Sequence, residues 1–563
     1  MNAAVPSSGS PPDLANVLRD VWFGSAFYRP FLRARAPQAF FAVAVDPWPG
    51  DPAKGEALLA GSFTAHGRSA PLTTEDGAPP WRRPDADPLW LAELNRFEWL
   101  RDLRDCGLPL AANMAAARVD EWIEDNPRWS PVGWATDVLG PRLVAWVRHY
   151  DFLASGATEG FLVRYLASIA RQRRHLERLI PGSLAGGGRV SALAAAVTVD
   201  IALARAGADH EKRLARSLAG LARALRTGVL DDGTVADRAP AVQARTLRDL
   251  IGLRGALLSA DRQPPTALTA AIERLAPMLR FFRHGDGGLA CFNGSSEGDA
   301  AAIDLILARA GGADEVPVEA TNGGFQRLAA GDSLLIADTG APTTGRLGGE
   351  AHAGTLSFEF SVGADRVVVN CGAYPGLAPE WRLSMRATAA HSTAVVDDTN
   401  SSDVSPHGGL EHPPRVVEAR RFEQDGALWL ETSHDGWRSL FGVVHRRRLW
   451  LAPDGTDIRG EDHLAGHNRK PVAKHASGAK FAVRFHLHPA VRVSLAHSGA
   501  SALLRLPSGQ GWRLRAAGAT IGVTESVYLG SGERIRRAAQ IVLTGALGPD
   551  GARVKWALTR VEG

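Results

Sequence analysis

Cysteine is scarce in this sequence: its 563 residues include only Cys106, Cys291 and Cys371. They are odd in number and far apart, so they supply neither a disulfide framework nor a Cys-x-x-Cys pair of metal ligands. This scarcity favours a reducing compartment. The N-terminal segment also lacks the basic stretch followed by an apolar core that defines a signal peptide. We therefore expect a cytoplasmic protein.

Long apolar runs and clusters of one charge are also missing. The most apolar stretch, residues 191–203, is shorter than the roughly 20 residues that cross a membrane as a helix. Lys and Arg total 64 against 60 Asp and Glu, whereas a nucleic-acid-binding protein concentrates basic residues in patches. The one tight basic run, Arg446-Arg447-Arg448, is predicted to be the polar side of a strand. We expect no transmembrane segment and no nucleic-acid partner.

The chain is longer than one hydrophobic core supports, so at least two domains are expected. Residues 1 to about 12 are rich in Pro, Ser and Gly and are predicted to be disordered, and the extension up to residue 87 is partly irregular. From residue 88 onward, apolar residues recur at the three- and four-residue spacing of amphipathic helices. The predicted helices cover residues 14–35, 91–103, 111–126, 140–153, 158–179, 191–206, 210–225, 241–258 and 265–282. Successive helices with short links favour an α/α toroid, an incomplete helical barrel, over residues 88–315.

Beyond residue 311 the pattern changes to short β-branched and aromatic segments separated by turn residues. The predicted strands cover residues 325–329, 333–338, 356–362, 366–370, 392–397, 415–424, 427–433, 442–451, 480–487, 491–496, 502–506, 511–516, 525–529 and 540–546. Strands at this spacing, with no helical pattern between them, predict an antiparallel β-sandwich over residues 316–563. The fold class is therefore multidomain, α then β, with the functional site expected in the cleft between the two domains.

A dense group of polar residues surrounds the first strands of the predicted sandwich. Glu350 and His352 lie two apart just before a strand, so an extended segment would direct both to one face. Asn370 ends the next strand, and His391 begins another. If these groups converge at one edge of the sandwich, they supply a base and an amide. The alternative is that they are buried hydrogen-bond partners in a tight β-arch.

Other candidates extend this group. Arg382 and Arg386 lie just before His391 and are predicted to clamp an anionic substrate. Tyr374, in a turn beside Asn370, is either an acid/base group or a packing residue. The remaining substrate-binding candidates come from the first half of the chain: His175, Arg238, Asn293 and Glu297. Asn293 and Glu297 lie in a loop that follows Gly285-Asp286-Gly287-Gly288, and loops of that composition often face a ligand, although a solvated loop is the alternative for each candidate.

The order of the two halves and several motifs resemble the heparinase II/III-like polysaccharide lyases, which include alginate and heparan lyases. In the second half the motifs are HAxxxSFEF at 352–360, VVxxGAYxG at 368–376, WRxxxRxTxAHxT at 381–393, HDGW at 434–437, HRRRLWL at 445–451 and RFHLHP at 484–489. In the first half they are NRFEWLRDLRDCG at 95–107, a tryptophan pair, and RLVAW at 142–146. The resemblance covers most of the chain.

The resemblance implies a reaction and a partner. The reaction is β-elimination at a uronic acid: a base removes the proton α to the carboxylate, and the 4-O-linked sugar leaves from the neighbouring carbon. The family uses an Asn or His and a Tyr from the toroid, with a His from the sandwich. The implied partner is an acidic polysaccharide or oligosaccharide. The periplasm or cell envelope becomes the alternative compartment, and the oligomeric state is left open.

Several residues of this sequence differ from the family's motifs. The family's H-x-H-x-D reads Glu350-Ala-His352-Ala-Gly354, so Glu350 stands at the usual catalytic histidine. The family's structural zinc, where present, has His and Asp ligands. Here the corresponding metal ligands are His352, His391 and Asn370, with the amide in place of a carboxylate, so the cofactor is either none or a structural zinc.

The toroid departs further. The family tyrosine aligns with Val242, and the Asn-His pair falls at residues 186–189, which contain neither residue type. The leading interpretation is a lyase in which Glu350 or His352 is the base and His391 orients the site. The amide of Asn370 and the guanidinium of Arg386 then neutralise the substrate carboxylate, and Tyr374 is a candidate for the missing acid. The alternatives are a non-catalytic glycan-binding protein and a hydrolase that uses Glu350.

Overall fold

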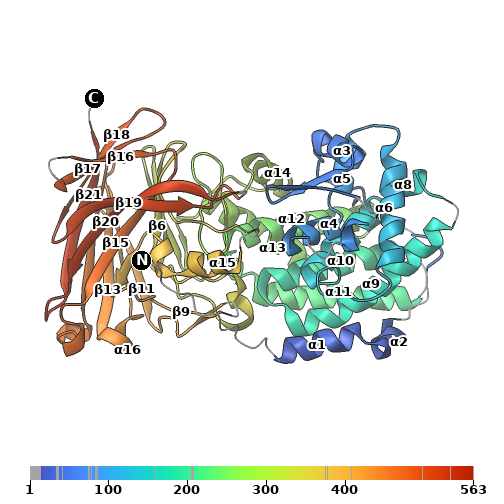
Figure 1. Cartoon of the computed structure of the whole chain (residues 1–563), viewed down its shortest axis with the longest axis horizontal. Coiled ribbons are helices and arrows are strands. Elements are labelled where there is room, and N and C mark those ends of the chain that lie inside the picture. Colours follow the sequence, from blue (N-terminus) through green and yellow to red (C-terminus); the bar gives the residue numbers. More distant parts are fainter. Residues whose placement is uncertain are drawn as a thin grey trace. The chain divides into compact units, whose positions relative to one another are not determined.

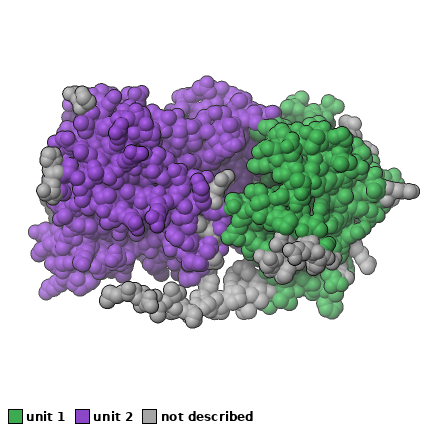
Figure 2. All heavy atoms as spheres, turned by 45° about the horizontal axis from the view of Figure 1, so that its top comes forward, with its two compact units in different colours: residues 1–184, 191–222, 252–264 green, residues 185–190, 223–251, 265–563 purple. Residues whose placement is uncertain are grey.

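The computed structural model describes residues 14–32, 37–40, 42–73, 77, 79–82, 86–158, 160–204, 208–374, 376, 378–406, 409–496, 499–532 and 534–561. The disorder expected for residues 1–12 lies outside this part of the chain. Two compact units are present (Figure 2). Unit 1 comprises residues 1–184, 191–222 and 252–264, and unit 2 comprises residues 185–190, 223–251 and 265–563. Unit 2 therefore contains several helical segments together with the sheets.

Helices dominate the first half of the chain, as its apolar periodicity predicts (Figure 1). The α-helices there are α1 (Leu14–Gly24), α2 (Arg29–Leu32), α3 (Pro52–Leu59), α4 (Pro88–Arg96), α5 (Leu100–Asp105), α6 (Ala111–Asp125), α7 (Thr136–Arg148), α8 (Tyr150–Ser155), α9 (Phe161–Ser183), α10 (Gly186–Leu203), α11 (Ala208–Gly228), α12 (Pro240–Ser259), α13 (Thr266–Phe281) and α14 (Ala300–Ala310). The stretch expected to be irregular holds α3 and a hairpin of β1 (Ser62–Ala65) and β2 (Arg68–Pro71). Each helix predicted between residues 91 and 282 is present, two of them divided by a break.

The core of unit 1 explains two of the motifs in the first half. Trp122 lies edge-on to Phe97 and Trp146, and the guanidinium of Arg142 lies over the Trp122 ring at 4.1 Å. Trp122 Nε1 donates to Asn95 Oδ1 at 2.6 Å, and Arg142 Nη1 donates to the Asn95 carbonyl at 2.9 Å. Buried polar groups are costly unless they are paired, so these contacts make Asn95 and Arg142 core residues of the helical fold.

Helix α10 is long and apolar enough to cross a membrane by length and composition. However, 83% of its apolar window is buried inside the protein. Burial of this kind identifies it as a core helix, and it is the one helix of this length and apolarity within the described residues.

Two large antiparallel sheets form the second half (Figure 1). The nine-stranded sheet runs β19 (Thr520–Tyr528), β20 (Arg536–Ala546), β15 (Lys480–Leu487), β7 (Asp365–Val369), β6 (Phe358–Val362), β5 (Ser333–Asp338), β4 (Phe325–Ala330) and β3 (Glu319–Ala320), with β8 (Ala394–Val396) also paired to β15. The eight-stranded sheet runs β11 (Val417–Gln424), β12 (Ala427–His434), β13 (Val443–Leu451), β14 (Asp457–Gly466), β21 (Ala552–Val561), β18 (Gly511–Ala517), β17 (Ser501–Arg505) and β16 (Arg492–Ala496). The predicted order of a helical toroid followed by a β-sandwich is confirmed, and the strands of the described residues form no closed barrel.

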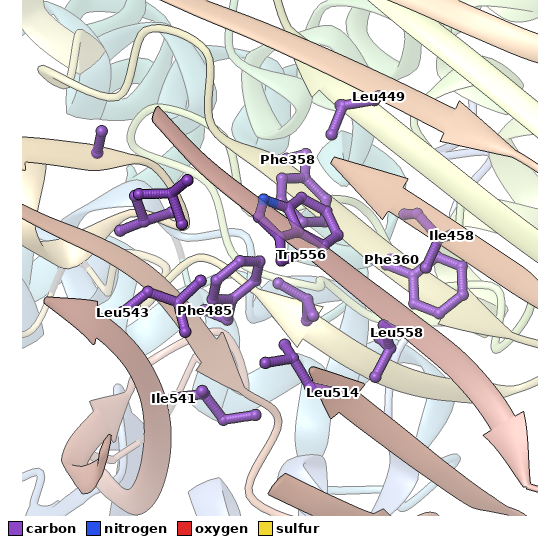
Figure 3. Packing of buried hydrophobic residues seen from close by; sticks show 14 of the residues in the cluster. Phe358, Phe360, Leu449, Ile458, Phe485, Leu514, Ile541, Leu543, Trp556 and Leu558 are labelled. Atoms are coloured by element: carbon purple, nitrogen blue, oxygen red, sulfur yellow. The ribbon is translucent and has the colours of Figure 1, made fainter. Parts of the chain in front are cut away.

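Apolar side chains from both sheets meet in one core (Figure 3). Phe358 on β6 stacks against Trp556 on β21, with ring centroids 5.7 Å apart and planes 6° from parallel. Phe485 on β15 contacts the same indole edge-on at 4.9 Å. Inward-facing residues of the two sheets therefore interdigitate, as expected for sheets that pack face to face.

The prediction for the basic run is wrong at its central residue. Arg447 is buried on β13, where its Nε donates to Asp462 on β14 at 2.7 Å. His445 Nε2 lies 2.7 Å from the same carboxylate, and Trp556 Nε1 donates to it at 3.0 Å. Because alternate strand residues face opposite sides, Arg447 faces inward while Arg448 lies outside and pairs with Glu431 at 3.0 Å.

Candidate functional site

The loop after α13 connects the first turn of α12 to the segment that carries Glu350 and His352. Ser295 Oγ accepts the Ala241 backbone N–H at 3.0 Å. The N–H of the neighbouring Gly294 donates to the Glu350 carbonyl at 2.8 Å. All of these residues belong to unit 2, so its helical and sheet segments meet at this loop.

Asn293 fixes this junction through both ends of its amide. Its Nδ2 donates to the Arg238 carbonyl at 2.6 Å, and its Oδ1 accepts the His352 backbone N–H at 3.1 Å. The residue is buried and has a φ of 50°, in the left-handed region that Asn adopts more readily than most residues. Asn293 therefore positions the backbone beside His352, while contact with a substrate stays a prediction.

Glu350 is the carboxylate at the centre of this region. It ends the 3₁₀ helix Gly345–Glu350, and no hydrogen bond to its side chain is found within the part of the chain that the structure describes. Burial raises the pKa of Glu350, the positive charges of Arg245 and Arg386 oppose this rise, and the negative charge of Asp237 adds to it. The Glu350 carboxylate is thus a stronger base than an exposed glutamate, and charges of both signs lie near it.

The two arginines come from different helices of unit 2. Arg245 is an exposed residue in the second turn of α12. Arg386 ends α15 (Pro379–Arg386) and donates through Nη2 to the Gly349 carbonyl, next to Glu350. Guanidinium groups bind carboxylate, sulfate and phosphate groups through paired hydrogen bonds. The region can therefore hold an anion.

Asp237 and Val242 fill the place where the family resemblance puts its toroid catalytic residues. Asp237 Oδ2 accepts the Gly187 N–H at 2.6 Å, at the start of α10. A Cβ on Gly186 would overlap the Asp237 carboxylate, and one on Gly187 would lie 2.6 Å from both Val242 Cγ1 and Thr246 Oγ1. Side chains at positions 186 and 187 are therefore excluded. Burial also raises the pKa of Asp237.

His352 and His391 form a buried imidazole pair. His352 Nδ1 lies 3.1 Å from His391 Nε2, and the two rings are nearly perpendicular. His391 Nδ1 lies 2.8 Å from the Ala387 carbonyl, an acceptor, so this nitrogen carries a proton. Burial lowers the pKa of His391 to about 4 and lowers that of His352 well below its usual range. Both rings are neutral at physiological pH.

The local geometry differs from the strands expected around these residues. Glu350 lies in a 3₁₀ turn instead of an extended segment, and β6 begins only at Phe358. His391 follows the 3₁₀ turn Thr388–Ala390, and β8 begins at Ala394. The extended segment predicted to carry Glu350 is therefore a 3₁₀ turn, although Glu350, His352, His391, Asn370 and Arg386 all lie in unit 2.

The zinc implied by the family does not fit the residues present. Asn370 Oδ1 accepts the Ser392 N–H at 3.0 Å, while its Nδ2, a donor, is buried without a partner. His352 and His391 are neutral, so the set supplies no negative charge to a buried dication. Among the residues that the structure describes, no group of three His, Cys, Asp or Glu side chains has metal-binding geometry.

Arg238 is bound within the protein. Its Nε donates to the Gly323 carbonyl at 2.6 Å, Nη1 donates to the Ala341 carbonyl at 2.9 Å, and Nη2 pairs with Asp338. The side chain is buried and its φ is 57°. These contacts connect the turn before α12 to strand β5, so the predicted anion contact would require displacement of this network.

Three other candidates lie in separate surroundings. His175 belongs to unit 1, where its Nδ1 lies 2.7 Å from Tyr28 Oη; burial lowers its pKa to about 3. Tyr374 packs in an apolar cluster with Met385 and Leu529. Arg382 is exposed on α15. The roles predicted for these three residues stay predictions.

Glu297 belongs to a second polar network in unit 2. Its Oε1 accepts the Tyr528 hydroxyl and lies 3.5 Å from His488 Nε2. In the same network Arg366 pairs with Asp286 through two nitrogens, at 2.6 and 3.0 Å. These groups connect the loop between α13 and α14 to the nine-stranded sheet. Sequence reasoning found Glu297 but missed its partners, because they are scattered over about 240 residues of the chain.

Arg245 and Asp237 are site residues that the sequence interpretation missed. A signal existed for both: Asp237 precedes α12, and Arg245 follows Val242 by three residues, which puts it on the same side of the helix. Arg245 belongs to no family motif, because the motif carries over only as far as Val242.

The family profile and the solved structures that match this chain indicate the same protein family. The profile described as "Heparinase II/III-like, C-terminal" matches residues 314–557. The "FtsZ-localized protein C" of Caulobacter vibrioides is 34% identical over 566 residues, covering 96% of this chain and 94% of that protein. A crystal structure of heparinase III superposes with a TM-score of 0.74 at 13% identity, covering 98% of this chain and 91% of that one.

The chain belongs to the heparinase II/III-like family. The heparan sulfate lyase HepC from Pedobacter heparinus has the same fold, with a TM-score of 0.60 at 14% identity, over 96% of this chain and 88% of that chain. At such identities the lyase structures establish the fold alone. Activity in this heparinase II/III-like protein depends on its own residues, and these differ at the three catalytic positions that the family resemblance implies.

Proposed function

We propose that this protein binds an acidic glycan at the Glu350 region and does not cleave it by the family's reaction. The observation that carries the proposal is the filled space at α10 and α12. The family resemblance puts the catalytic tyrosine at Val242 and the Asn or His at residues 186–189, and here Asp237 occupies the space beside Gly186 and Gly187. β-Elimination needs an acid for the leaving oxygen, and Val242 has no proton to donate.

The charges that remain suit recognition of an anion. Arg245 and Arg386 are close enough to Glu350 to influence its pKa, and Arg245 is exposed. A uronate carboxylate between these guanidinium groups would form charge-assisted hydrogen bonds, which are stronger than those between neutral groups. A neutral glycan offers hydroxyl acceptors but no opposite charge and would gain less, so the proposed site favours acidic sugars.

The relative from Caulobacter vibrioides suggests where the protein acts. That protein's name describes it as localised with FtsZ, and identity of 34% over nearly the whole of both chains is far above that of the solved lyases. We propose that this protein also localises with FtsZ and that its glycan site serves there. The cytoplasmic compartment expected from the sequence is part of this proposal.

Calorimetric titration of the full chain tests the binding site. Uronate oligosaccharides are titrated against neutral cello-oligosaccharides of equal length, with wild type, Arg245→Gln, Arg386→Gln and the control Arg492→Gln. Arg492 is exposed on β16 in the same unit. Loss of one charged hydrogen bond, worth about 1.5–3 kcal/mol, should weaken binding about tenfold or more. Equal affinity of the two site variants and the control would refute the assignment.

A second candidate is catalysis with Glu350 as base, as the family resemblance implies. The supporting observation is the raised pKa of Glu350, since a carboxylate with a higher pKa is a better base. Proton transfer can be tested without a completed elimination, because a base alone exchanges the proton α to the uronate carboxylate. Deuterium incorporation at that carbon, measured by NMR and abolished in Glu350→Gln, would favour this candidate over binding alone.

A further inference from the structure

We propose that a direct His352–His391 hydrogen bond has replaced the metal at the position where zinc-containing family members hold one. The two imidazoles then form part of a metal-free clamp between residues 349–354 and 386–391. This proposal is independent of whether the protein binds or cleaves a glycan.

The distance between the imidazoles alone does not decide between a hydrogen bond and a metal. The nitrogens are 3.1 Å apart, and two ligands of one tetrahedral zinc, each at about 2.0–2.1 Å, would lie about 3.3 Å apart. The third predicted ligand distinguishes the two arrangements. Asn370 already uses its amide oxygen for the Ser392 N–H, and its buried Nδ2 cannot bind a cation.

Gly354 provides independent support, because it removes the other carboxylate of the family motif. A Cβ at this position would lie 2.6 Å from Cδ2 and 3.1 Å from Nε2 of His391. Real Cβ atoms do not approach so closely, so the His391 ring occupies space that any larger residue at position 354 would need. The absence of a side chain at Gly354 lets this ring lie within hydrogen-bonding distance of His352.

Other hydrogen bonds already hold the two segments together. The Ala353 N–H donates to the Arg386 carbonyl at 2.8 Å, and the Thr388 hydroxyl donates to the Ala353 carbonyl at 2.7 Å. The Ser401 hydroxyl donates to the same carbonyl at 3.2 Å, and Arg386 Nη2 donates to the Gly349 carbonyl. A structural zinc would duplicate this clamp.

The hydrogen bond also fixes the tautomers of both rings. His391 keeps its proton on Nδ1, where the Ala387 carbonyl accepts it, so its Nε2 is an acceptor. His352 must then donate from Nδ1, which leaves a lone pair on its Nε2. That nitrogen has no hydrogen-bond partner among the described residues. His352 therefore offers an acceptor for a hydroxyl group, and His391 is the positioning residue behind it.

Zinc content and thermal stability test the proposal. The full chain and its variants are incubated with zinc chloride, desalted and analysed for zinc by mass spectrometry, and the Tm is measured with and without EDTA. Wild type should retain far less than one zinc per chain and show the same Tm in both conditions. His391→Ala should lower the Tm equally with and without EDTA.

The Asn370→Asp variant restores one carboxylate and should retain zinc, with a Tm that falls in EDTA; the double variant Asn370→Asp/His391→Ala should lose that zinc. One zinc per wild-type chain that is lost in His391→Ala would overturn the proposal. A folded Asn370→Asp variant that retains no zinc would overturn the argument that the missing carboxylate excludes the metal.

Discussion

Replacement of Asp462 by Asn should destabilise the sandwich strongly. The carboxylate is fully buried and accepts hydrogen bonds from Arg447 and Trp556, with His445 at hydrogen-bonding distance. Its removal leaves the Arg447 charge buried and unpaired, which costs about 3–5 kcal/mol. For a β-sandwich of about 250 residues, this corresponds to a fall in Tm of about 6–20 °C.

The Asp462→Asn change should also alter the structure around His352 and His391. Arg447 Nη1 donates to the carbonyls of Leu356 and Ser392 at 2.8 and 2.9 Å, and these residues flank the strands nearest His352 and His391. Thermal unfolding of the full chain is measured by differential scanning calorimetry. The matched control is Glu431→Gln, which removes the half-buried partner of the exposed Arg448 and should lower the free energy of unfolding by less than about 1 kcal/mol. Equal shifts in Tm for the two variants would refute the claim that the buried pairing stabilises the sandwich.

Three further outcomes are expected. Gly354→Ala should lower the free energy of unfolding by about 1–3 kcal/mol, because the added methyl group displaces the His391 ring; an unchanged midpoint of urea unfolding would contradict this. His391 has a folded pKa of about 4 against an ordinary 6.5, so its contribution to stability should be lost as pH falls from 6.5 to 4, by about 3 kcal/mol; His391→Gln should show a shallower acid slope, and an identical slope would exclude this histidine as the cause. The pKa of Glu350 is raised above 4.5, and the site gains a negative charge when the pH rises above this pKa, so binding of an acidic glycan should weaken over that pH range. Glu350→Gln should remove this pH dependence in calorimetry, and a pH profile of the variant equal to that of wild type would contradict the prediction.

The fold was largely predictable because its helices and most strands follow simple apolar periods. Strand β14 escaped prediction since two of its inward positions are Gly460 and Asp462. Gly460 makes room for the Trp556 ring, and Asp462 pairs with buried Arg447. An inward-facing carboxylate breaks the alternation of apolar and polar residues that predicts a strand. Its partner Arg447 lies on another strand, so the residues of β14 alone do not reveal the pairing.

The candidate site was predictable only in part. The motif positions identified Glu350, His352 and His391, because these residues lie within 42 positions of one another. Arg245 and Asp237 come from over 100 residues earlier, where an arginine on a helix looks like any solvated residue. Their placement depends on tertiary contacts through the loop after α13, which no local pattern contains.

The most direct test of the central claim is ultraviolet absorbance of the unsaturated uronate product, recorded at high enzyme concentration with alginate, heparan sulfate, hyaluronan and glucuronan oligosaccharides that calorimetry shows to be bound. The account predicts binding of acidic glycans with no rise in absorbance. A rise that persists in wild type and disappears in Glu350→Gln would contradict it and establish β-elimination without the family's tyrosine.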